Sequence, residues 1–78
     1  MVIPIIVSDL PVTNPDGSVS INFTATYENY EFRDAIVGTP EFINGLTADE
    51  INTIEVDRFN NWYAIVTAPV PDEPVVEV

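Results

Sequence analysis

Residues 13–30 read TNPDGSVSINFTATYENY, and this stretch decides the fold. In its first six residues, Pro15 fixes φ at one corner of a turn, and Gly17 can take the left-handed conformation that closes a bulged hairpin. Apolar and polar residues then alternate strictly through residues 19–27. This period of two predicts a strand with one apolar face on a core and one polar face outward.

The turns at the two ends of this strand predict antiparallel neighbours. Upstream, residues 3–12 carry two prolines, which suits an edge strand because proline cannot donate to a sheet ladder. Downstream, a tight turn at residues 28–29 would place Tyr27 opposite Tyr30 and return the chain through residues 32–37. The sequence therefore predicts a three-stranded antiparallel meander.

The returning strand has an imperfect phase. A strict two-residue register puts Asp34 on the core face opposite Phe23, where a carboxylate is costly. We therefore expect a bulge near Arg33 and Asp34 that returns Ala35 and Val37 to the inner face. The alternative is that the Arg33 and Asp34 neighbourhood is used at an interface.

Helix signals follow the meander. The TP at residues 39–40 can start a short helical turn that ends at the NG of residues 44–45. The TADE of residues 47–50 is a capping box. In this motif the Thr47 hydroxyl accepts a hydrogen bond from a free backbone amide of the first turn, and the Glu50 side chain reaches back to accept one from the Thr47 amide. These patterns predict a short helical turn followed by a main helix.

The main helix is expected to continue to about residue 66. Advancing by 100° per residue places Arg58 and Glu55 inside an apolar stripe. That stripe consists of Ile51, Ile54, Phe59, Trp62, Ile65 and Val66. The β-rich WYAIVT keeps open the alternative of a strand over residues 62–67.

These elements predict an α+β fold, in which a three-stranded antiparallel meander packs on one C-terminal helix. Residues 1–67 would form a single small domain. Residues 68–78 contain three prolines and predict an extended, proline-rich acidic arm. Its apolar end, with Val75, Val76 and Val78, is either loose or added as a strand to the sheet edge of another chain.

Charge and composition exclude several classes of function. The chain has thirteen carboxylates, two arginines, no lysine and a net charge of −11, so we expect neither nucleic acid nor an anionic membrane as a partner. It lacks cysteine and histidine, which removes disulfides and the usual zinc ligands. We expect no cofactor, no metal and no enzymatic activity, because an ordinary nucleophile and base are missing.

The candidate contact surface lies on the main helix and consists of Arg58, Phe59, Trp62 and Tyr63. Arginine and aromatic residues are enriched at interface anchors. The alternative is that Arg58 pairs with Glu55 one turn earlier and stacks on Trp62 one turn later. The polar face of the central strand, formed by Ser20, Asn22, Thr24 and Thr26, is either a wet surface or a surface kept free of charge for packing.

The NPDGSVSINFTATYENYEFRDAIV of residues 14–37, followed by LTADEINTIEVDRFNNWYAIVTAP at residues 46–69, resembles small acidic structural proteins of tailed bacteriophages. The resemblance implies a virion component made in the cytoplasm of the bacterial host, foremost a capsid decoration or cement protein. Its partners would be the major capsid protein or another virion structural protein, and it would be a homo-oligomer, a dimer or a trimer. A neck, tail or baseplate subunit is the alternative within this class.

Two alternatives come from other classes. An acidic inhibitor could mimic the phosphates of DNA and block a host nuclease or polymerase, provided that its carboxylates line up along one face. In this sequence the acids are dispersed over turns, helix and arm. A regulatory module that binds a basic peptide is the third possibility.

Overall fold

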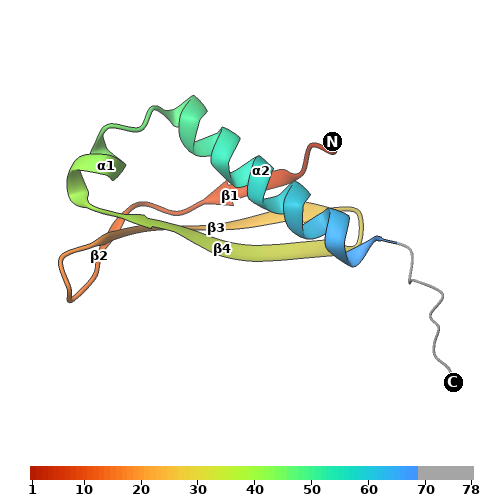
Figure 1. Cartoon of the computed structure of the whole chain (residues 1–78), viewed down its shortest axis with the longest axis horizontal. Coiled ribbons are helices and arrows are strands. Elements are labelled where there is room, and N and C mark those ends of the chain that lie inside the picture. The colour runs from red at the N-terminus through yellow and green to blue at the C-terminus, as the bar shows by residue number, and fades with distance from the viewer. Residues whose placement is uncertain (69–78) are drawn as a thin grey trace, which may run out of the picture.

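The computed structural model describes residues 1–68 and shows an α+β fold, with an antiparallel sheet and a long C-terminal helix (Figure 1). This confirms the fold class expected from the sequence. The elements, in chain order, are β1 (Ile5–Ser8), β2 (Val12–Thr13), β3 (Val19–Tyr27), β4 (Tyr30–Gly38), α1 (Pro40–Asn44) and α2 (Ala48–Val66).

Strand β3 is the centre of the sheet, since every other strand pairs with it. The single edge strand predicted upstream is divided into β1 and β2, which follow one another along the same edge of β3. Ser8 lies opposite Phe23 and Val12 lies opposite Ser20. The edge therefore advances by four residues, from Ser8 to Val12, while β3 covers the same length in three. One extra residue is therefore inserted next to Pro11, which has no N–H to continue the ladder.

The pairing of β3 with β4 runs without interruption from the hairpin turn to Gly38. Asp34 lies opposite Phe23, so the bulge predicted beside it is absent and that prediction is wrong. The inner face of β4 consequently presents buried Ile36, while Val37 lies exposed on the other face with Ala35. The strict register is tolerated because the Arg58 guanidinium on α2 binds the Asp34 carboxylate.

Both helices begin at the caps that the sequence predicts. The Thr39 hydroxyl accepts from the Phe42 amide, and Pro40 opens α1. In α2 the Glu50 amide donates to Thr47 Oγ1 at 3.1 Å, while the Thr47 amide donates to Glu50 Oε1 at 2.8 Å. The helix continues to Val66, so the chain after residue 61 is helix and not the alternative strand.

The core lies between the sheet and α2, which crosses the sheet and ends near the β3–β4 hairpin (Figure 1). Its buried apolar side chains are Val19, Ile21, Phe23, Ala25, Ile36, Ile43, Val56 and Phe59. The contact face of α2 differs from the predicted stripe, because Val56 is buried whereas Ile65 is 75% exposed. The face is centred on Phe59, whose ring packs against the rings of Tyr27 and Phe32 on the sheet.

We predict that Phe59→Ala lowers the free energy of unfolding by about 3–5 kcal/mol, since it leaves a cavity at the centre of a small core. Ile65→Ala, on the same helix but 75% exposed, should change it by no more than about 0.5 kcal/mol. Urea unfolding followed by circular dichroism measures both. Equal losses in the two variants would contradict this assignment of the core.

Candidate functional site

Six aromatic rings gather at the hairpin end of the sheet, beneath the last turns of α2. They belong to Tyr27, Tyr30, Phe32, Phe59, Trp62 and Tyr63. The ring of Trp62 stacks on Phe32 with centroids 5.2 Å apart, and the ring of Tyr63 meets Tyr30 edge to face at 5.1 Å. Because each outer ring is held by others, this aromatic cluster presents a surface of fixed shape.

The predicted contact residues occupy different depths in this cluster. Trp62 and Tyr63 are half-buried and each retains accessible surface, and Arg58 beside them is also half-buried. Phe59 has 0% exposure, which corrects its assignment to the contact surface, since it lies in the core and supports the outer rings. The valines predicted at the end of the arm, Val75, Val76 and Val78, lie outside the described residues.

Arg58 joins the helix to β4. One of its terminal nitrogens donates to Asp34 Oδ2 at 3.2 Å and to the Ala35 carbonyl at 2.7 Å. The alternative pair of Arg58 with Glu55 is not formed, because the Glu55 carboxylate accepts from Ser8 on β1 while Arg58 binds Asp34 on β4. The two charged side chains are each 40% exposed, so solvent screens the pair and its contribution to stability is about 0–1 kcal/mol. Its main effect is to fix where α2 sits against β4.

The same arginine covers part of a sheet edge. The Asn22 carbonyl accepts from the Asp9 amide, so the backbone groups of Asn22 point toward the β1 side of β3. Ala35, opposite Asn22, then points its own N–H and C=O away from β3 and toward the free edge of β4. Arg58 binds that carbonyl, which reduces the exposed hydrogen-bonding capacity of the edge.

Glu55 is the buried acid of the domain, with an exposure of 2%. Its Oε2 accepts a hydrogen bond from the Ser8 hydroxyl at 2.8 Å, which connects α2 to β1. Burial raises the pKa of the Glu55 carboxyl, and the hydrogen bond from Ser8 lowers this pKa by a smaller amount. The one feature of the sequence that points to this contact is a serine at an inward-facing position of β1. That serine alone does not identify Glu55 as its partner.

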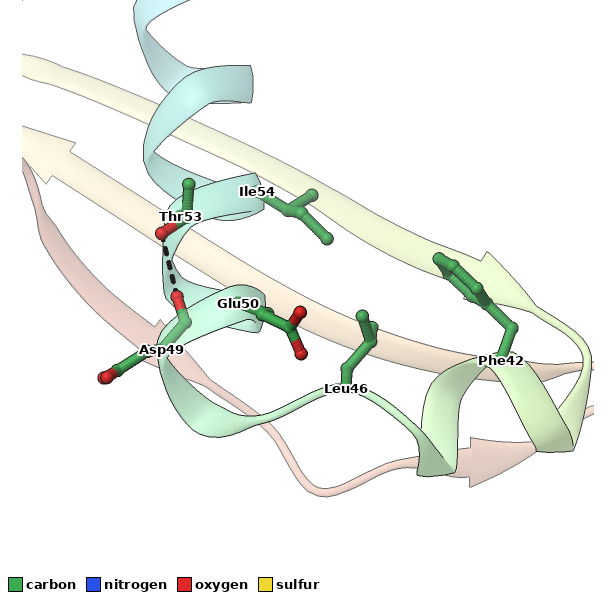
Figure 2. A pocket seen from close by; sticks show the side chains of 6 residues that line it. All are labelled: Phe42, Leu46, Asp49, Glu50, Thr53 and Ile54. Atoms are coloured by element: carbon green, nitrogen blue, oxygen red, sulfur yellow. Dashed lines mark hydrogen bonds between the residues drawn. The ribbon is translucent and has the colours of Figure 1, made fainter.

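A groove between α1 and the first turns of α2 was not singled out in the sequence. It has a volume of about 410 Å³, and Figure 2 shows its six lining side chains: Phe42, Leu46, Asp49, Glu50, Thr53 and Ile54. Two of its polar side chains are engaged locally, since the Thr53 hydroxyl donates to the Asp49 carbonyl and Glu50 caps the helix, while the Asp49 carboxylate is exposed. The phenyl and aliphatic walls offer a ligand apolar contact.

Within residues 1–68, no three histidine, cysteine, aspartate or glutamate side chains come together in a way that could hold a metal ion. Among the helices of this part of the chain, none is long and apolar enough to cross a membrane. Comparisons with protein-family models, with curated proteins and with solved structures found no match.

We predict that Glu55→Gln stabilises the domain at neutral pH and that the gain disappears in acid. The raised pKa of folded Glu55 means that its contribution to folding becomes less favourable as the pH rises above the unfolded-state value of about 4.5 and through the folded-state pKa. Below that pH interval the protonated glutamic acid of the wild type and the glutamine of the variant are both neutral, so the difference in stability disappears.

Urea unfolding of both proteins between pH 3.5 and 8, roughly the range over which a perturbed glutamate titrates, measures the difference. Ser8→Ala provides a companion variant, because it removes the hydroxyl that bonds the carboxylate and should destabilise more at neutral than at acid pH. A difference between Glu55→Gln and the wild type that does not change with pH would contradict a buried, titrating Glu55.

Proposed function

We propose that this chain is a non-enzymatic structural protein of a tailed bacteriophage virion, most directly a capsid decoration or cement protein that stabilises the shell. The assignment to a virion comes from the resemblance of residues 14–37 and 46–69 to small acidic phage structural proteins. The proposed partner is the major capsid protein or another virion structural protein. The protein would act in the virion, after synthesis in the host cytoplasm.

The observation that carries a binding function is the surface formed by Arg58, Trp62 and Tyr63. Two large amphipathic rings are half-buried and held by their aromatic neighbours, with a half-exposed guanidinium beside them. Such side chains are enriched among interface anchors, and rings that are already fixed lose little conformational entropy on binding. We call this the aromatic–arginine surface and assign to it the attachment to the shell.

A shell suits a domain of this size. A chain of 78 residues buries a limited core, and binding to a partner adds stability by mass action. A lattice of identical subunits offers many equivalent sites, which a dimer or trimer can engage together. A neck, tail or baseplate subunit would bind its neighbours in the same way, but the virion would offer fewer equivalent sites.

A DNA mimic is supported less well by the arrangement of the acids. Five of the described carboxylates have structural roles: Asp16 accepts from Ser18 in the first turn, Glu31 pairs with Arg33, Asp34 pairs with Arg58, Glu50 caps α2 and Glu55 is buried. The others are spread over the β1–β2 connection, the β3–β4 turn and both helices. A mimic of DNA needs a continuous array at phosphate-like spacing along one face.

We predict that Trp62→Ala weakens attachment to empty shells of the major capsid protein by about tenfold or more, as expected for an interface anchor. Cosedimentation with shells measures the occupancy. Ile65→Ala is the matched control, because it truncates an exposed apolar side chain one turn away on α2. Truncation after Ala68 tests the arm separately. Normal occupancy of the Trp62→Ala variant would remove the aromatic–arginine surface as the attachment site.

A further inference from the structure

One face of the sheet carries no helix. The buried apolar side chains of β3 point toward α2, so the alternate residues of all four strands lie on the opposite face, which we call the open face. Exposed aliphatic side chains concentrate there and along its β1–β2 edge. Of the paired strand residues, these are Ile5, Val7, Val12 and Val37.

The relief of the open face follows from the strand register. On β1 and β2 the aliphatic residues form a ridge, while the neighbouring column on β3 consists of small polar side chains. The ridge residues lie opposite members of this column, with Val7 beside Thr24 and Val12 beside Ser20. A ridge of branched side chains therefore runs next to a shallow groove formed by Asn22, Thr24 and Thr26. At the other end of this column Ser20 is only 9% exposed, and the Asn14 side-chain amide donates to its hydroxyl at 2.7 Å.

The open face is nearly neutral, although the chain has a net charge of −11. Its charged residues on β4, Glu31 and Arg33, bind each other at 2.7 Å. Asp9 lies at the margin, in the connection between β1 and β2. The helix side, in contrast, exposes Asp49 and Asp57. A second copy of so acidic a chain is repelled by most of the surface, and the open face is where two copies can approach.

We propose that the open face binds the open face of a second copy, forming a two-fold symmetric dimer. A two-fold axis parallel to the strands and between the ridge and the groove places the ridge of each copy over the groove of the other. The contact is then self-complementary, as a dimer of this symmetry requires. The paired Glu31 and Arg33 remain at the two outer margins, where they stay solvated.

The area of the open face sets the expected strength. Strand β3 has nine residues and is about 30 Å long, and the two columns that overlap, ridge and groove, are together about 10 Å wide. The two footprints together cover roughly 600 Å², which is below the roughly 1,200 Å² at the lower limit of standard interfaces. We therefore expect a weak dimer, with a dissociation constant on the order of 100 μM.

This inference extends the proposed function, which calls for a homo-oligomer, and it can fail independently. The aromatic–arginine surface is assembled from α2 and the hairpin end of the sheet and is not part of the open face. A dimer would carry two attachment surfaces and gain avidity on a shell. A monomeric protein that still binds shells would remove the dimer and leave the proposed function intact.

Sedimentation equilibrium of the full chain, over a dilution series around the expected dissociation constant, tests the proposal. We expect the mass of two chains at the highest concentration. Val7→Glu places a charge in the centre of the ridge and should weaken the dimer by at least about tenfold. Ile65→Glu adds the same charge at an exposed site on α2 and should leave the dimer unchanged. A single-chain mass throughout the series would overturn the proposal, and so would an unaltered dimer in Val7→Glu.

A second measurement covers the case in which Val7→Glu does not fold. Because the chain has no cysteine, one can be placed in the groove as Thr24→Cys and, for comparison, on the exposed side of α2 as Thr53→Cys. We expect maleimide labelling of Thr24→Cys to slow as protein concentration rises, while Thr53→Cys labels at a constant rate. Labelling of Thr24→Cys that slows only when shells are added would overturn the proposal and assign the open face to the shell.

Discussion

The coverage of the sheet by a single long helix is the constraint on which the rest of the structure depends. A two-layer domain buries one face of its sheet, and the alternation along β3 assigns each residue to the buried or the open side. The buried side receives phenylalanine, isoleucine and valine, which pack around Phe59. The same alternation leaves a neutral face of small polar and aliphatic residues without a helix. Core and open face are thus two consequences of one pattern.

Polar contacts add to the core in fixing where the helix lies on the sheet. Packing around Phe59 joins the two layers, and the hydrogen bonds of Arg58 with β4 and of Glu55 with Ser8 each require a specific geometry. They connect α2 to β4 on one side and to β1 on the other. The helix is therefore fixed across the width of the sheet, and the rings of Trp62 and Tyr63 are carried to the hairpin end. This position gives the aromatic–arginine surface its shape.

The sequence was informative where structure is local and uninformative where it depends on distant partners. The TNPDGS turn, the alternation through Tyr27 and the capping box at Thr47 each predict an element from adjacent residues. The extra residue next to Pro11, the Arg58 contact that lets Asp34 stay on the inner face without a bulge, and the burial of Glu55 depend on contacts between distant segments. For the candidate site, residue types identified Arg58, Trp62 and Tyr63, but helical periodicity alone could not show that Phe59 faces inward with no exposed surface.

The central claim is that one sheet face forms the core while the other is kept for protein contact. The most direct test is the access of a soluble paramagnetic agent to the methyl groups of Ile5, Val7 and Val12, measured by NMR in dilute and in concentrated solution. The account predicts that these methyls broaden when the protein is dilute and are protected when it is concentrated, while the Ile65 methyls broaden in both. Equal broadening of the open-face methyls at every concentration would contradict it.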